Sequence, residues 1–143
     1  TFPSRGAQEN IEVNMASKLE VLRAANKWKK RRFDYGNADC CQWAGFVVKE
    51  LTGVDYLESF NYQDEAAAYK IIEGNGSLKH TVSSVLGPPS KTLSDGDPCL
   101  VTMSTGDLMG IKLGDKILCL CKNGIIQIDK ENLICGWNKC RMQ

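Results

Sequence analysis

The chain has 143 residues, of which 43% are hydrophobic, which is enough for one domain with an ordinary core. Its 18 basic and 17 acidic side chains give a formal charge of +1, so no global field attracts nucleic acid, a membrane or an acidic substrate. No apolar run has the length of a membrane span, and the N-terminus lacks the apolar core of a secretory signal, so we expect a cytoplasmic protein.

The seven cysteines are an odd number, and a chain of this size needs no disulfide scaffold, so free thiols are expected. The pairs Cys40-Cys41 and Cys119-x-Cys121 lack the spacing of zinc knuckles, and His80 is the only histidine. Neither a metal site nor a cofactor is therefore expected. Small core hydrophobes are expected at the cysteines of the apolar strands, namely Cys99, Cys119, Cys121 and Cys135.

The first residues carry little periodic signal. Residues 1 to 16 show no sustained period and contain Pro3 and Gly6, which predicts an N-terminal arm outside the fold. This arm would either dock on a partner or be an upstream extension, because Met15-Ala16-Ser17 is typical of a translation start. Residues 17 to 143 are expected to form a single domain.

A first helix is predicted over residues 17 to 31. Ser17 followed by Glu20 is a capping-box pattern, and Leu19 and Leu22 recur at helical spacing. The end of this helix is basic, and its cations surround Trp28: Lys27, Lys29, Lys30, Arg31 and Arg32. Cations at this position stabilise the negative end of the helix dipole.

The same basic cluster has an alternative interpretation as a phosphate contact in a structural protein that touches nucleic acid. Such binding would depend steeply on salt and would weaken on substitution of Lys29 and Arg31. A solvated helix end without a ligand is the favoured interpretation, because long basic side chains are easily hydrated.

The second helix is predicted to start at Cys40. Asp39 and Gln42 form a capping pair, and Gly53 stops the helix in the left-handed cap position. Apolar residues then share one helical face: Cys40, Trp43, Ala44, Val47 and Leu51. The width of this apolar face predicts that the helix lies at the centre of the core.

Two further helices are predicted, over residues 63 to 73 and 77 to 86, and the period then changes to that of strands. The expected strands are 98 to 103, 109 to 113, 116 to 121, 125 to 128 and 134 to 137. Gly114-Asp115 and Asn123-Gly124 are two-residue hairpin signals. Helices followed by an antiparallel meander define an α+β fold, with the sheet packed on the Cys40 helix.

The start of the second predicted helix contains the candidate reactive residue of the sequence, Cys40. Unpaired amides and the helix dipole stabilise a thiolate at Cys40, and the same amides can form an oxyanion hole. The alternative is a structural thiol, because Cys40 also falls on the apolar face. Adjacent thiols are expected to face different ways, so that either Cys40 or Cys41 lies in the site and the other packs against the sheet.

The segment from Phe33 to Val47, which contains Asp39-Cys40, resembles the "G-x-x-D-C-S-G-F-V" helix of NlpC-type, papain-like cysteine peptidases. The resemblance implies that Cys40 stands at the place of the nucleophile. Gly96-Asp97 resembles the Gly-Asp turn of that family, and Met109-Gly110-Ile111 resembles its "H-V-G-I" strand.

The chain is also similar to a group of small phage proteins related to these peptidases. They share Asp-Cys-Cys, the "L-T-G-V-D" of residues 51 to 55, an Ala-rich third helix and a C-terminal tryptophan like Trp137. The similarity covers residues 19 to 140. It implies an NlpC-like, papain-like fold with a β-meander of about five short strands.

One residue departs from the peptidase pattern. The position of the histidine is occupied by Leu108, which cannot transfer a proton, and loss of a general acid or base lowers a rate by about 10² to 10⁴. His80 is a poor substitute because it lies in the fourth predicted helix, among polar neighbours. Asp107 is expected to be a solvated turn residue, and Asp39 an N-cap that orients the helix.

The resemblance therefore implies a degenerate, non-catalytic papain-like domain, a pseudoenzyme, carried in the tail, neck or ejection apparatus of a phage particle. Its expected partners are other phage structural proteins, bound through residues 1 to 16 or the domain surface, after synthesis in the cytoplasm of the host bacterium. The alternative is a working cysteine hydrolase that cuts peptidoglycan stem peptides, with Cys40 as nucleophile and an unconventional base.

Overall fold

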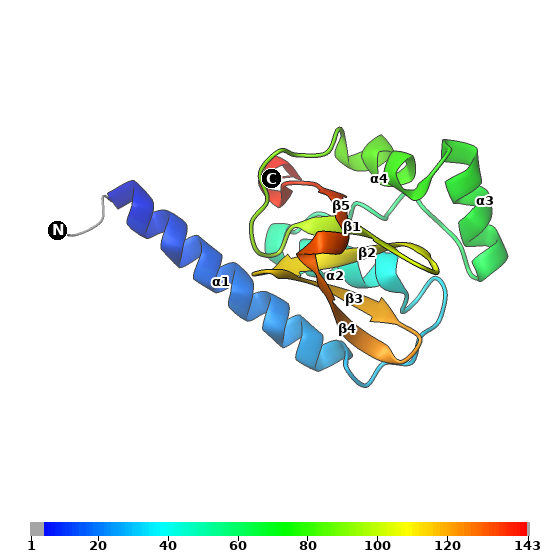
Figure 1. The fold of residues 1–143 in the computed structure, drawn as a ribbon, viewed down its shortest axis with the longest axis horizontal. Helices are drawn as coiled ribbons and strands as arrows, with labels where there is room; N and C mark the ends of the chain where they lie inside the picture. The colour runs from blue at the N-terminus through cyan, green and yellow to red at the C-terminus, as the bar shows by residue number, and fades with distance from the viewer. Residues whose placement is uncertain (1–4, 143) are drawn as a thin grey trace.

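The computed structural model describes the backbone of residues 5–142 and the side chains of residues 15–142. Helices come first along the chain: α1 (Arg5–Trp28), α2 (Cys40–Thr52), α3 (Glu65–Asn75) and α4 (Leu78–Leu86). Strands follow: β1 (Pro98–Met103), β2 (Gly106–Leu113), β3 (Lys116–Cys121), β4 (Gly124–Asp129) and β5 (Leu133–Gly136). The 3₁₀ turns η1 (Lys130–Asn132) and η2 (Lys139–Met142) flank β5. The predicted α+β class is confirmed (Figure 1).

The sheet has the order β4-β3-β2-β1-β5, and all neighbouring strands are antiparallel. One face carries α2 and the main core, and Trp43 fixes the helix there by donating from Nε1 to the Leu118 carbonyl at 2.8 Å. Because side chains alternate along a strand, the other face has its own cluster: Cys99, Val101, Ile117, Cys119 and Ile128. The sheet is thus buried on both faces.

The central helix forms as predicted. Asp39 is its N-cap and accepts a bond from the Gln42 amide, while Gly53 closes it at φ 80°. Trp43, Ala44 and Val47 are buried toward the sheet. Local capping and the apolar face therefore agree with the tertiary contacts, which is why the sequence predicts this helix well.

The first helix differs from its prediction. It begins at Arg5 rather than Ser17 and ends at Trp28 rather than residue 31. Ser17 is buried within the helix, so the capping-box interpretation is wrong. Most residues after Gly6 are adequate helix formers, so the helix begins before Ser17 although the sequence shows no sustained apolar period there. Residues 1 to 4 of the predicted arm lie outside the described residues.

Two faces of α1 are distinct. The face toward the domain buries residues at helical spacing: Ser17, Val21, Ala24 and Trp28. The opposite face leaves Met15, Leu19 and Leu22 between 46% and 61% exposed. Figure 1 shows the N-terminal part of α1 extending away from the sheet. No helix within residues 5–142 is both long and apolar enough to cross a membrane.

Some helix and strand boundaries differ from the predicted ones. The third helix is Glu65–Asn75 instead of 63 to 73, and β2 begins at Gly106, ahead of the apolar run that predicted it, because Gly106 and Asp107 pair with the end of β1. The loop between β3 and β4 is residues 122 and 123, since Cys121 pairs with Gly124. The hairpin at Gly114-Asp115 is confirmed.

Candidate functional site

A cavity of about 990 Å³ lies at the N-terminus of α2, and we call it the thiol cavity. Its lining includes three thiols and the carboxylate that caps α2, namely Cys40, Cys41, Cys121 and Asp39. Its aromatic wall consists of Phe33, Tyr35, Phe60, Tyr62 and Tyr69. Its aliphatic wall consists of Leu57, Ala68, Ile71, Ile72, Leu78, Val82, Leu108, Leu120 and Ile126. The volume is at the upper end of small-molecule pockets, about 300–1,000 Å³.

Asp39 is a structural centre of this site. Its Oδ1 accepts a bond from the Gln42 amide at 2.8 Å, and its Oδ2 accepts bonds from the Gly36 amide at 2.9 Å and the Tyr62 hydroxyl at 2.6 Å. The side chain is buried. Both oxygens are therefore engaged, and Asp39 orients the helix start, as predicted, instead of acting on a thiol.

Gly36 holds the turn before α2 against the segment that carries Tyr62. Its φ is 89°, and a Cβ there would lie 2.3 Å from the Tyr62 carbonyl oxygen. Gly53 provides a matched comparison because its φ is 80° but its Cβ would meet nothing within 4 Å.

We expect Gly53→Ala to lower the free energy of unfolding by about 1–2 kcal/mol, the strain of a left-handed alanine. Gly36→Ala should lower it further, because the backbone of Tyr62 must also move. Urea denaturation of both variants measures the difference. Equal losses would show that the contact with Tyr62 is not needed.

Cys40 has the chemistry of an activated thiol. It lines the thiol cavity and is partly exposed. A hydrogen bond from the Cys41 thiol lowers the pKa of Cys40, and the backbone amides of Met109 and Cys41 lower it as well, although burial and the charge of Asp39 act in the opposite direction. The net pKa is below that of an ordinary cysteine, as expected at a helix N-terminus.

Cys41 is the proton donor of the pair. Its bond to Cys40 and its burial raise its pKa well above the usual range. Both thiols line the same cavity, so the expectation that only one of them faces the site is wrong. In the first turn of a helix neighbouring side chains differ by about 100° in direction, and both reach the open end.

Leu108 occupies the wall of the thiol cavity, and its side chain also packs against the cluster on the far face of the sheet. The next residue, Met109, is buried in the core under α2 and presents its amide to Cys40. Asp107 also lines the cavity, but it is exposed and lies within β2, paired with Thr102, instead of in a turn.

His80 lies apart from the thiols. It is exposed on α4, its Nδ1 is 2.8 Å from the Ser77 hydroxyl, and it does not line the thiol cavity. Its backbone amide donates to the same hydroxyl, which caps the helix. The structure therefore brings Asp39, Cys40 and Leu108 to one cavity and leaves His80 outside it.

Two tyrosines of the site were not predicted from the sequence. Burial, followed by the charge of Glu65, raises the pKa of Tyr35, and burial raises the pKa of Tyr62 far above its usual value. Both phenols therefore stay protonated at neutral pH and supply no base. Tyr62 lies 23 positions from Asp39, and no local pattern signals a contact over that distance.

All seven cysteines are free thiols. Cys99 and Cys119 are fully buried, as predicted for core residues, whereas Cys121 and Cys135 are only partly buried. Cys121 lines the thiol cavity, a position that its place in an apolar strand did not indicate. Within residues 5–142, no cluster of three His, Cys, Asp or Glu side chains has the arrangement of a metal site.

The Gly96-Asp97 turn lies at the other end of α2. A Cβ on Gly96 would lie 2.5 Å from Leu51, which is 11 residues after Cys40 and hence about 17 Å along the helix. Asp97 is fully buried and pairs with Lys139 at 3.4 Å. This turn therefore fastens the C-terminus and takes no part in thiol chemistry.

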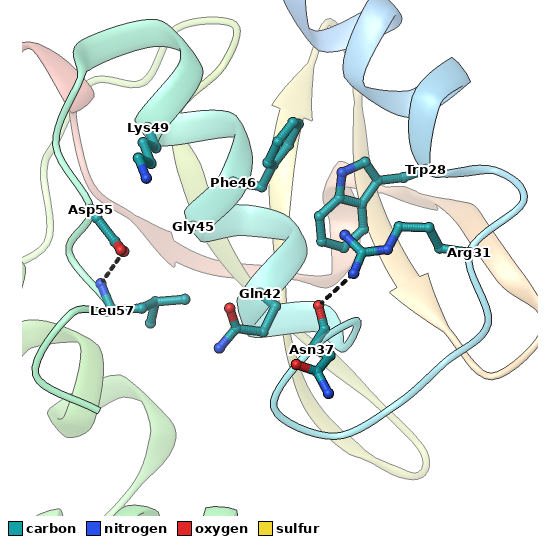
Figure 2. A pocket seen from close by; sticks show the side chains of 9 residues that line it. All are labelled: Trp28, Arg31, Asn37, Gln42, Gly45, Phe46, Lys49, Asp55 and Leu57. Carbon is teal, nitrogen blue, oxygen red and sulfur yellow. Dashed lines mark hydrogen bonds between the residues drawn. The ribbon is translucent and has the colours of Figure 1, made fainter. Parts of the chain in front are cut away.

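A second cavity of about 220 Å³ lies beside α2, where the basic end of α1 meets it (Figure 2). Arg31 stacks over Trp28 with its guanidinium carbon 4.2 Å from the ring centroid and donates to the Asn37 carbonyl at 3.2 Å. Lys27 lies 5.6 Å from the Phe46 ring. Two cations of the cluster are thus engaged in packing, which favours the structural interpretation.

A family model described as a domain of unknown function, DUF6950, matches residues 16–138. The match includes α2 with its thiol pair, all five strands and Trp137. No match was found among curated proteins. Since the family model covers most of the sequence, the chain belongs to the DUF6950 family.

Proposed function

We propose that the chain is a papain-like domain without histidine-assisted hydrolysis, which uses the thiol cavity to bind a ligand. The composition of the cavity lining supports this proposal: it includes Cys40 and Cys41 but not His80, the only histidine of the sequence. A thiolate that attacks an amide must pass a proton to the departing amine. Asp39 is fully hydrogen-bonded, and the raised pKa of Tyr62 makes it a poor acid.

The ligand site belongs, in this proposal, to a structural component of a phage particle. The similarity of the sequence to small phage proteins supports this setting. Proteomic analysis of purified particles tests it. We expect the chain at a fixed stoichiometry in particles, and its recovery only in the soluble lysate would contradict the proposal.

Peptide hydrolysis tests the loss of catalysis directly. Wild-type protein and Cys40→Ala are incubated with peptidoglycan stem peptides, and newly released amines are counted. We expect equal, background rates, because no imidazole lines the cavity to protonate the departing amine. Release of amines that requires Cys40 would overturn the proposal.

A working cysteine hydrolase is the second candidate, and the lowered pKa of Cys40 is the observation that favours it. Its nucleophile would be Cys40, its oxyanion hole the first amides of α2, and its substrate a peptidoglycan stem peptide. The amine-release assay separates the two candidates.

The reactivity of Cys40 is a prediction of its own. Iodoacetamide should modify Cys40 faster than the exposed Cys140 at pH 7, because the lowered pKa leaves more thiolate. As pH rises, the rate at Cys40 should reach its plateau at a lower pH than the rate of a cysteine in the denatured chain. Peptide mapping by mass spectrometry measures the rates at Cys40 and Cys140 in one sample. Modification of Cys140 first would contradict activation of Cys40.

A further inference from the structure

The wall of the thiol cavity is apolar over most of its area, and part of it has no packing partner. Helix α3 has no buried residue, yet Ala68, Ile71 and Ile72 share one of its faces and line the cavity. Tyr69 on the same helix is 53% exposed, and Ile126 on the opposite wall is 37% exposed. An apolar ligand would cover this surface, and its burial is the main source of binding free energy for such a ligand.

Charges are confined to the edge of the cavity. Glu65, Asp107 and Lys122 line it, and all three are exposed, whereas Asp39 in the interior is fully hydrogen-bonded. The net charge of the edge is negative. An uncharged apolar chain therefore fits the cavity better than an anionic molecule such as a free fatty acid.

The Cys40 thiol determines the chemistry of the head group. Without an imidazole to protonate it, an amine is a poor leaving group, whereas a thiolate is a good leaving group that departs unprotonated. We propose that the thiol cavity takes a long acyl chain presented as a thioester and that Cys40 accepts the acyl group. This inference rests on the proposed function, in which the cavity binds a ligand and lacks histidine-assisted hydrolysis.

The exchange is balanced and needs no oxidant. The Cys40 thiolate attacks the carbonyl carbon, a new carbon–sulfur bond forms, and the carbon–sulfur bond of the donor thioester breaks. The released thiolate takes up the proton that Cys40 gave to water on ionising. The amides of Cys41, Gln42 and Trp43 are engaged, so the Cys40 amide, the first of α2, stabilises the oxyanion of the intermediate. Because no imidazole lines the cavity to activate water, we expect the acylated Cys40 to accumulate, with one acyl group per chain.

The full chain is incubated with N-acetylcysteamine thioesters of acetic, octanoic and dodecanoic acid, and peptide mapping locates the acyl group. The exposed Cys140 serves as an internal reference for exchange without a cavity. Each buried methylene strengthens binding about fourfold at most. The ratio of the rates at Cys40 and Cys140 should therefore rise by about 100-fold or more from acetyl to dodecanoyl.

A pair of variants on α3 isolates the cavity. Ala68→Trp fills it, whereas Ala66→Trp places the same side chain on the exposed face of the same helix. We expect Ala68→Trp to abolish the chain-length effect, while Ala66→Trp keeps the chain-length effect of the wild type. Circular dichroism confirms that both variants fold.

Three outcomes would overturn the inference: equal rates for all chain lengths, acylation at Cys41 or Cys121 instead of Cys40, or equal effects of the two tryptophan variants. None of these affects the proposed loss of hydrolysis, which fails only if amines are released from peptides in a Cys40-dependent manner. The two failures are therefore distinguishable.

Discussion

Substitution of Asp97 by alanine should lower the free energy of unfolding by about 3–5 kcal/mol. Asp97 is fully buried. Its Oδ1 accepts bonds from the Lys139 amide at 3.0 Å and from Lys139 Nζ at 3.4 Å. Its Oδ2 accepts a bond from the Ser94 amide at 2.7 Å. Alanine leaves the buried ammonium and both amides without this acceptor, and that desolvation is the physical cause of the loss.

The matched control for Asp97 is another acidic side chain on the sheet. Asp115 pairs with Lys130 at 3.8 Å, but both side chains are largely exposed, so Asp115→Ala should change stability by less than about 0.5 kcal/mol. Asp97→Asn retains an acceptor for only one of the two amides, and its loss should fall between those of the two alanine variants. Urea denaturation measures all three variants. Similar losses for Asp97→Ala and Asp115→Ala would contradict a structural role for the buried pair.

Raising the pH above about 9 should destabilise the protein steeply, because two core thiols must stay protonated in the folded state. Burial, followed by the charge of Asp97, raises the pKa of Cys99 to about 12, and burial raises the pKa of Cys119 as well. In the unfolded chain both thiols ionise near pH 8.5. The folded state then binds more protons, so stability falls as pH rises, by about 1.4 kcal/mol per thiol and pH unit.

The measurement is urea denaturation at pH 8, 9 and 10 in the presence of a reducing agent. Two thiols predict a loss of about 2–3 kcal/mol between pH 9 and 10, and ionisation of the buried Tyr56 adds to it above pH 10. A variant with Cys99→Ala and Cys119→Ala starts from a lower stability but should lose about 2–3 kcal/mol less over this interval, while the remaining thiols with a raised pKa, Cys41 among them, still contribute. Parallel curves for the two proteins would show that these thiols do not determine the alkaline limit.

The helix that carries the site was predictable in detail. The capping pair of Asp39 and Gln42, the apolar face and Gly53 all act within a few residues, so each signal is complete in the local sequence. The strand runs and the Gly114-Asp115 hairpin are local in the same sense. The first helix was predicted less well, because residues 5–16 have no sustained apolar period, the signal that predicts an amphipathic helix.

The composition of the cavity was not predictable in this way. Tyr62 reaches Asp39 across 23 positions, and Cys121 joins Cys40 only because β3 passes beside the start of α2. The pairing of Asp97 with Lys139 spans 42 positions. Contacts of this kind leave no periodic trace in the chain, since either partner alone looks like an ordinary loop or strand residue.

The sequence by itself determined the α+β class, the central helix with Asp39 as its cap, and the position of Cys40 at the helix start, because capping and periodicity act over a few residues. Only the tertiary structure decided that both thiols share one apolar cavity and that His80 lies outside it. Which side chains surround a thiol depends on the packing of elements distant in sequence. That packing therefore determines the pKa of Cys40 and which groups can donate a hydrogen bond to it.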